Sequence, residues 1–256
     1  MSAANDLPVR TLAALVMIVV AGGALWFGGF AFWILAAAAA LFMMDEWANL
    51  EQASGRHKRL AQYALFVPLA LLSPWGAGPD FFVIGLLVGA AFLTVIVTQR
   101  PRLALGTLYC GLPVVALVLL RDQGLLLAFW AMALVWATDI GAYFAGRTIG
   151  GPKLARRISP SKTISGLCGG MLAAGLLGWA LHDFYGLPAT LALATPILAA
   201  LAQAGDLFES ALKRRAGVKD SGSMLPGHGG VLDRLDGLVP VAPVAALLVE
   251  LFRTPT

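Results

Sequence analysis

"GLLLAFWAMALVWATDIGAYFAG", residues 124–146, is an apolar segment of 23 residues that contains a single charged side chain, Asp139. An α-helix needs about 20 apolar residues to cross the ~30 Å hydrocarbon core of a bilayer, so this segment is long enough to span a membrane. Comparable segments recur along all 256 residues, 59% of which are hydrophobic and only 12% charged. Soluble domains are about 25% charged. The sequence therefore predicts an integral membrane protein without a separate soluble domain.

Apolar segments that fit membrane-spanning helices number nine, so the expected fold class is an all-α, polytopic membrane protein. Their ranges are 11–27, 29–48, 59–74, 80–98, 104–120, 124–146, 163–182, 188–212 and 236–252. The first, third and fifth are short for a crossing, and the glycine pairs between residues 22 and 29 could bend the first two into one hairpin. The N-terminal segment also resembles a signal peptide, but the many segments after it favour a retained first helix.

The distribution of basic residues sets the expected orientation. With a cytoplasmic N-terminus, the inside segments hold 16 of the 18 Lys and Arg residues, and only Arg121 and Arg253 lie outside. This asymmetry follows the positive-inside rule and supports an odd number of spans. It places the polar loops 147–162 and 213–235 in the cytoplasm and the C-terminus outside. It also accounts for the net charge of +4 without a nucleic-acid partner.

Two acidic residues lie inside apolar segments, Asp139 and Asp206. They precede Arg147 and Lys213 by eight and seven residues, which puts both carboxylates ~10–12 Å below the cytoplasmic edge. A carboxylate at that depth costs roughly 2.5 kcal/mol or more unless it faces water, a partner or a cation, so we interpret both as functional. The alternative is a structural aspartate paired with a Ser, Thr or Lys of another helix.

Helical spacing groups other side chains with Asp206. Ser210 and Lys213 follow it at i+4 and i+7, so all three share one helix face. Glu209 lies off that face, where a pair with Lys213 is the plain interpretation.

Two more acids, Asp233 and Asp236, lie three residues apart at the start of the last apolar segment and also share a face. With Asp139 and Asp206 they make four carboxylates near the cytoplasmic boundary, which would repel one another without a cation. Carboxylate oxygens suit Mg²⁺, which commonly takes one or two of them and completes its shell with substrate phosphates. The sequence therefore predicts a magnesium site that involves these four residues.

The polar loop 147–165, "RTIGGPKLARRISPSKTIS", leads directly into the seventh apolar segment. A helix that begins at the cytoplasmic side presents free N–H groups and a positive dipole end there, so Lys162 and Thr163 are candidates for binding an anion. The alternative is a helix cap combined with positive-inside anchoring.

The polar loop 213–235 is rich in glycine. Glycines such as Gly229 and Gly230 allow consecutive N–H groups to form a nest that cradles phosphate, and Lys213, Lys219 and Arg234 add positive charge. The glycines could instead mark a flexible loop. In the same way, His228 is either a phosphate or base contact or a packing residue of the loop.

The stretch "SALKRRAGVKDSGSMLPGHGGVLDRLD", residues 210–236 and called the signature stretch below, resembles the signature of the phosphatidate cytidylyltransferases, also called CDP-diacylglycerol synthases. The segments "WATDIGAYFAGR" and "SPSKT" upstream also resemble blocks of that family, and the multi-span layout agrees along the whole chain. One departure is Ser165, where many members carry an acidic residue; another is Ile164, where many carry an aromatic one.

The resemblance implies a reaction, CTP + phosphatidate → CDP-diacylglycerol + pyrophosphate, in phospholipid biosynthesis. It implies dependence on Mg²⁺, potassium as a second cation, and a homodimer embedded in membrane lipid, here a bacterial-type inner membrane. A single domain would cover residues 1–256, with N-terminal helices in 1–130 and a catalytic half in 131–256.

The site residues that the resemblance implies fall into three overlapping sets. The catalytic residues would be Asp206, Lys213, Asp233 and Asp236. The substrate-binding residues would be Lys162, Thr163, Ser210, Lys219, Asp220, His228, Gly229, Gly230 and Arg234. The metal ligands would be Asp206, Asp233, Asp236 and Asp139.

Two other classes of protein share some of these features. A secondary transporter for an anionic solute also uses intramembrane acids and helix N-termini, but it would be expected to show repeated halves, which the sequence lacks. A CTP-using polyprenol kinase or a CDP-alcohol phosphotransferase is the second alternative. The phosphotransferase needs closely spaced Asp pairs in a different order from "DRLDG".

Overall fold

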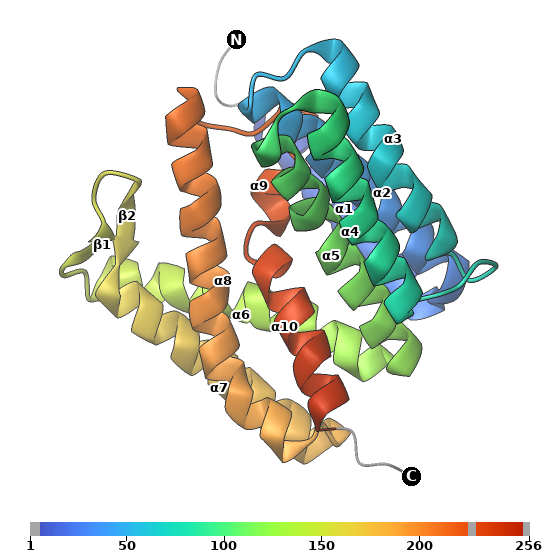
Figure 1. The fold of residues 1–256 in the computed structure, drawn as a ribbon. Helices are drawn as coiled ribbons and strands as arrows, with labels where there is room; N and C mark the ends of the chain where they lie inside the picture. Colours follow the sequence, from blue (N-terminus) through green and yellow to red (C-terminus); the bar gives the residue numbers. More distant parts are fainter. Residues whose placement is uncertain (1–5, 225–228, 253–256) are drawn as a thin grey trace.

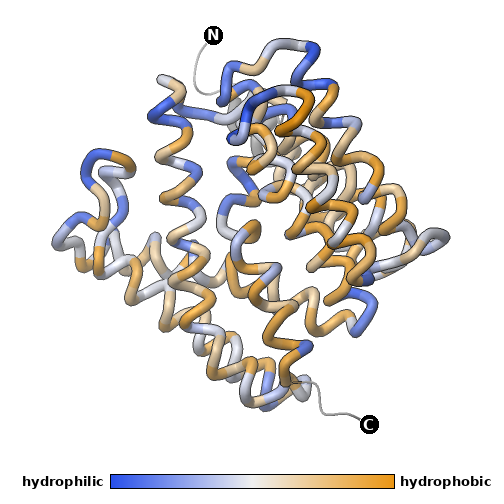
Figure 2. Tube along the Cα trace, viewed as in Figure 1, coloured by the Kyte–Doolittle hydropathy of each residue, from blue (hydrophilic) through white to orange (hydrophobic). Residues whose placement is uncertain are grey.

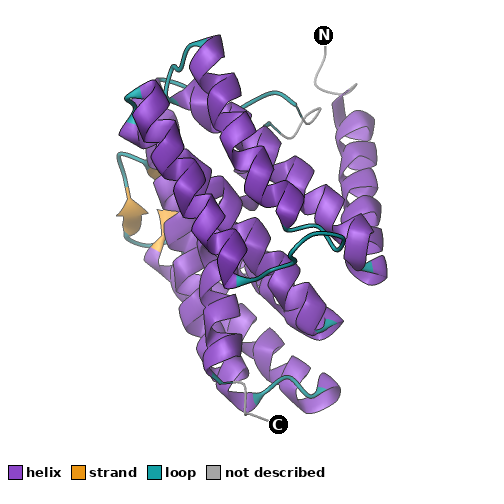
Figure 3. Cartoon of the chain, turned by 45° about the vertical axis from the view of Figure 1, so that its right-hand side comes forward, coloured by secondary structure: helices purple, strands orange, loops and turns teal. Residues whose placement is uncertain are grey.

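The computed structural model describes residues 6–224 and 229–252, and it is nearly all helical in those ranges (Figure 1). The helices are α1 (Asp6–Phe27), α2 (Gly29–Leu50), α3 (Gly55–Leu71), α4 (Phe81–Thr98), α5 (Pro101–Gln123), α6 (Leu125–Thr148), α7 (Ile164–Tyr185), α8 (Ala189–Ala216), α9 (Leu232–Leu235) and α10 (Leu238–Leu251). Two short strands, β1 (Lys153–Ala155) and β2 (Ser159–Thr163), lie between α6 and α7. Figure 3 shows this hairpin on one side of the helices.

Six of the described helices are long and apolar enough to cross a membrane, namely α2, α4, α5, α6, α7 and α8. The apolar parts of α1 (Thr11–Phe27) and of α10 are shorter than a full span, and α3 has 17 residues. The prediction of a multi-pass, mainly α-helical membrane protein is therefore confirmed. The count of nine spans stays a prediction.

The structure corrects the sequence analysis at two places. The loop before α7 contains an antiparallel hairpin, in which Lys153 pairs with Thr163 and Ala155 with Ser159, so the fold is not purely α-helical. The expected last segment, 236–252, is one helix, α10, but the separate short helix α9, which ends before Asp236, and the break between α9 and α10 were not predicted. The chain bends there against α8, where Gly205 leaves room for the Asp236 carbonyl and the Pro240 ring.

Polar segments gather at one end of the molecule. Figure 2 shows hydrophilic residues at the turn between α2 and α3 and at the end of α8, whereas most of the helical surface is apolar. Large apolar side chains such as Phe81, Phe92 and Ile197 are exposed on the helices, as expected for surfaces that face lipid tails. The polar end is the one that the positive-inside rule assigns to the cytoplasm.

The helices α6 and α7 pack closely because small residues line their contact. A Cβ atom on Gly141 would lie 2.5 Å from the carbonyl oxygen of Gly169, and one on Gly170 would lie 2.8 Å from the carbonyl oxygen of Thr138. Small residues let helix backbones approach in membranes, where apolar surface alone gives no preference for helix over lipid. The close contact holds β2 and the start of α7 against the end of α6.

We predict that Gly169→Ala destabilises this helix pair by about 1–3 kcal/mol, as overpacking does. The new methyl group would overlap Ala145 and lie 2.9 Å from the carbonyl oxygen of Gly141. Thermal unfolding in detergent measures the effect. The matched control is Gly85→Ala in α4, where an added Cβ meets nothing within 4 Å. An equal response of both variants would contradict the packing argument.

Candidate active site

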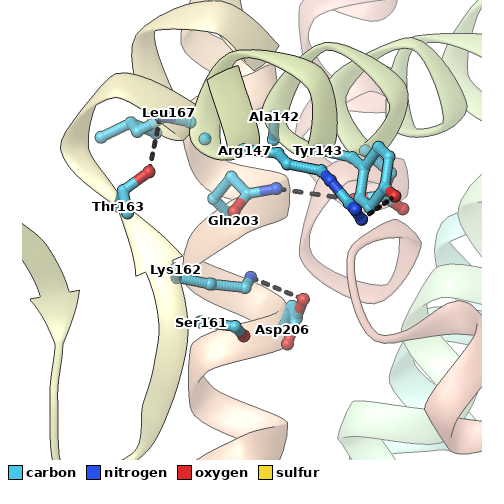
Figure 4. Close-up of a pocket in the computed structure, with 12 residues that line it drawn as sticks. Ala142, Tyr143, Arg147, Ser161, Lys162, Thr163, Leu167, Gln203 and Asp206 are labelled. Carbon is cyan, nitrogen blue, oxygen red and sulfur yellow. Dashed lines mark hydrogen bonds and ion pairs between the residues drawn. The ribbon is translucent and has the colours of Figure 1, made fainter. Parts of the chain in front are cut away.

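A cavity of about 370 Å³ lies between α6, β2, α7 and α8. Asp139, Tyr143 and Arg147 line it from α6, and Gln203 and Asp206 line it from α8. Figure 4 shows Lys162 reaching across the cavity from β2 toward Asp206. The structure thus brings the two intramembrane acids of the sequence analysis to one polar cavity.

The Lys162 ammonium forms an ion pair with Asp206, with 2.5 Å between Nζ and Oδ2. The other carboxylate oxygen of Asp206 accepts a hydrogen bond of 3.2 Å from the Ser210 hydroxyl, as the i, i+4 spacing indicated. The amide of Gln203 lies 3.5 Å from Asp139 Oδ1, at the limit of a hydrogen bond. Asp206 therefore has the lysine partner that the structural alternative proposed, and the pair also faces the cavity.

Thr163 caps α7. Its hydroxyl oxygen accepts a hydrogen bond of 3.0 Å from the Gly166 N–H and lies 3.0 Å from the Ser165 hydroxyl, which itself donates to the Gly150 carbonyl. The capping alternative is thereby confirmed. The role of Thr163 in substrate binding stays a prediction, although the residue lines the cavity.

A second polar network joins the end of α8 to α9. The Lys213 ammonium lies 2.7 Å from Glu209 Oε2 and 2.6 Å from Asp233 Oδ1. These side chains are 13%, 0% and 6% exposed for Lys213, Glu209 and Asp233, so the ion pairs are buried. The predicted pair between Glu209 and Lys213 is confirmed, and Asp233 is its third member.

Asp233 receives further hydrogen bonds through its second oxygen. The N–H groups of Ser221 and Gly230 donate to Oδ2 at 2.9 and 2.8 Å, and the Ser221 hydroxyl lies 3.0 Å away. Burial alone would raise the pKa of Asp233, but the Lys213 ammonium and these two amides outweigh it and hold the pKa below its ordinary value. Asp233 is therefore a carboxylate at neutral pH, and the N–H groups of Ser221 and Gly230 bind it.

The remaining acid of the predicted cluster, Asp236, accepts a hydrogen bond of 2.7 Å from the Gly237 N–H. It lies near enough to Asp206 and Asp139 for their charges to repel its own, but it is not among the residues that line the cavity. Within residues 6–224 and 229–252, no group of three or more His, Cys, Asp or Glu side chains has metal-binding geometry. The metal role of the four acids stays a prediction.

The other predicted residues lie around the loop between α8 and α9. Lys219 and Asp220 are exposed, and Arg234 is exposed on α9 and interacts electrostatically with Asp139. Gly229 has a φ of +79°, a conformation that favours glycine. His228 lies outside the described residues.

The sequence analysis missed Glu46, a buried acid near the end of α2. Its carboxylate accepts hydrogen bonds from the N–H groups of Val231 and Leu232 and from the Ser221 hydroxyl. The signal in the sequence is an acidic residue at the cytoplasmic end of an apolar segment, in "MMDEWANL". Acidic residues without a special role also occur at such boundaries, so this signal does not single out Glu46.

A family model described as "Cytidylyltransferase family" matches residues 8–252. The chain belongs to this family. It is 38% identical to the phosphatidate cytidylyltransferase of Brucella suis over 98% of this chain and 96% of that protein. It is 36% identical to the phosphatidate cytidylyltransferase of Staphylococcus epidermidis, over 94% of this chain and 98% of the relative. The resemblance inferred from the signature stretch is therefore confirmed for this cytidylyltransferase.

We predict that Lys213→Met destabilises this cytidylyltransferase by about 3–5 kcal/mol, because it leaves two buried carboxylates without a counter-charge. The thermal unfolding of the purified protein in detergent measures the loss. Arg214→Met is the matched control, because this exposed neighbour makes only hydrogen bonds of 3.4 and 3.5 Å to backbone carbonyls. A Lys213 variant as stable as the Arg214 variant would show that the buried network contributes little.

Proposed function

We propose that this cytidylyltransferase transfers the cytidylyl group of CTP to phosphatidate in phospholipid biosynthesis. A phosphate oxygen of phosphatidate forms a bond to the α-phosphorus of CTP, the bond from that phosphorus to the β-phosphate oxygen breaks, and pyrophosphate leaves. The observation that carries the proposal is the similarity over nearly the full length to relatives named phosphatidate cytidylyltransferase. The polar cavity beside apolar helices is compatible with one water-soluble and one lipid substrate.

The chemical difficulty of this reaction is to bring two anionic phosphates together. Phosphatidate already carries a nucleophilic phosphate oxygen, so the protein needs positioning and electrostatic stabilisation more than a general base. In our proposal Lys162 and Arg147, which line the cavity, bind phosphate oxygens there. Lys213 stays paired with Asp233 and fixes the signature stretch beside the cavity.

The cavity carries carboxylate oxygens, which are the kind of ligand that Mg²⁺ prefers. Asp139 and Asp206 line the cavity and Asp236 lies near them, and the mutual repulsion of these three carboxylates would fall if a cation lay among them. Bound there, Mg²⁺ would neutralise charge on the reacting phosphates and on the departing pyrophosphate. Among the described residues Asp233 Oδ1 accepts a bond from Lys213 alone, so this oxygen would have a lone pair left for a cation. Potassium as a second cation stays a prediction of the family resemblance.

We also propose that the protein crosses a bacterial inner membrane nine times, with the N-terminus and the active site on the cytoplasmic side. The bacterial relatives and the asymmetric distribution of basic residues support this arrangement. In Figure 1, α1 begins and α10 ends at opposite ends of the molecule, which is compatible with an odd number of crossings. A homodimer and the division at residue 130, which falls within α6, remain predictions.

The reaction is tested with purified protein in detergent, labelled CTP and short-chain phosphatidate. We predict that CDP-diacylglycerol and pyrophosphate form in equal amounts, that EDTA abolishes their formation, and that added Mg²⁺ restores it. Asp233→Asn should lower turnover by roughly 100-fold or more while the protein remains inserted, because the Lys213 ion pair is lost.

The matched control is Asp183→Asn, an exposed aspartate near the other end of α7, which should keep wild-type turnover. Normal activity of the Asp233 variant would remove Asp233 from the mechanism. A folded wild-type protein that binds CTP but makes no CDP-diacylglycerol would contradict the proposed acceptor, and polyprenol would then be tried.

The orientation is tested with reporters fused to the chain. A phosphatase that is active only outside the cytoplasm should be active when it follows residue 256 and inactive when it follows Gly217, at the end of α8. The same reading at both positions would contradict the proposed topology.

A further inference from the structure

Glu46 is a buried carboxylate that α2 contributes to the signature stretch from far away in the sequence. The residue is 4% exposed. Its Oε1 accepts a hydrogen bond of 2.8 Å from the Val231 N–H, and its Oε2 accepts one of 2.8 Å from the Leu232 N–H. These amides belong to the two residues directly before Asp233. Glu46 therefore determines where the backbone that leads into Asp233 lies.

Ser221 links Glu46 to Asp233 on the other side of the loop. The Ser221 hydroxyl lies 3.0 Å from Glu46 Oε2 and 3.0 Å from Asp233 Oδ2. A hydroxyl has one hydrogen to donate, so it serves one of the two carboxylates at a time. The backbone amides supply the remaining donors: Val231 and Leu232 bind Glu46, and Ser221 and Gly230 bind Asp233. The two carboxylates thus order the two limbs of one loop, residues 220–222 and 229–232.

The glycines of the loop fit closely around Glu46. A Cβ atom on Gly222 would lie 2.8 Å from Glu46 Oε1, and one on Gly230 would lie 2.5 Å from Glu46 Oε2 and overlap the Ser221 hydroxyl. The loop therefore approaches the carboxylate so closely that side chains are excluded at both positions. The loop therefore needs glycines for its close approach to Glu46 as well as for conformational freedom.

We propose that Glu46 is a positioning residue for cytidylyl transfer: it clamps the two limbs of the loop so that Asp233 meets Lys213 in a single geometry. This inference rests on the proposed function. Glu46 does not line the cavity, and it acts on the reaction through the backbone of Val231 and Leu232. A displacement of about 1 Å at a catalytic group can cost roughly 100-fold in rate.

The test uses Glu46→Gln, which keeps the size of the side chain but turns one acceptor into an NH₂ donor that faces a backbone N–H. We expect kcat to fall roughly tenfold to 100-fold. KM for CTP and for phosphatidate should stay within about threefold of wild type, since Lys162 and Arg147 are untouched. Without any substrate, amide hydrogen exchange should speed up in peptides that cover 219–224 and 229–235, and stay unchanged in α6 and α7.

Two further variants complete the design. Ser221→Ala removes the hydroxyl link, and the double variant with Glu46→Gln should lose little more activity than the more affected single variant, because both changes release the same loop. Asp45→Asn is the matched control and should match wild type. Asp45 is the neighbouring acid on α2, and its ion pair of 2.6 Å joins it to Lys58 rather than to the loop.

Wild-type kcat in Glu46→Gln would overturn the clamp, and so would faster exchange spread equally over α6 and α7, which would indicate a general loss of stability. If Glu46→Gln cannot be purified, Ser221→Ala tests the clamp in its place. Faster amide exchange confined to the loop, together with a lower kcat, would support the clamp. Wild-type exchange and wild-type kcat would overturn it. A wild-type protein without cytidylyl transfer would count against the proposed function, while the exchange measurement would still decide whether the clamp exists.

Discussion

The buried ion pair between Lys213 and Asp233 joins the last turns of α8 to α9, and the local structure at the polar end depends on it. A charge that leaves water needs a partner, and here a single ammonium lies between two carboxylates, those of Glu209 and Asp233. Once Asp233 is held there, its second oxygen gathers the amides of Ser221 and Gly230. A loop that would otherwise be exposed and glycine-rich thereby acquires a defined path between α8 and α9.

The helix α8 carries two polar networks on neighbouring faces. Asp206 faces the cavity, pairs with Lys162 of the hairpin and accepts a hydrogen bond from Ser210, whereas Glu209 and Lys213 face Asp233 of α9. One rigid helix therefore sets the distance between the cavity and the loop. The close packing of α6 on α7 fixes the opposite wall in a similar way, because backbone contacts leave less freedom than long side chains do.

Much of this arrangement could be predicted from the sequence, because its causes are local. Apolar segments gave most of the helices, and helical spacing gave the contact of Asp206 with Ser210 and that of Glu209 with Lys213. The hairpin at residues 153–163 was not predicted, because the composition of this segment is typical of a basic loop. The interruption before α10 was missed for another reason: it depends on Gly205 of α8, which lies about thirty residues earlier in the sequence.

Glu46 illustrates the limit most clearly, since its partners lie 175 to 186 residues further along the chain and no spacing rule connects them. Its position also has a consequence for the modularity of this fold. A fragment that carries the signature stretch but begins after α2 would fold its loop around an empty space, with two backbone amides left without their acceptor. The segment that holds most of the chemistry is therefore not an autonomous unit. Completion of the loop requires α2, which is synthesised before the signature stretch, so the order of synthesis from the N-terminus suits the way this loop is built.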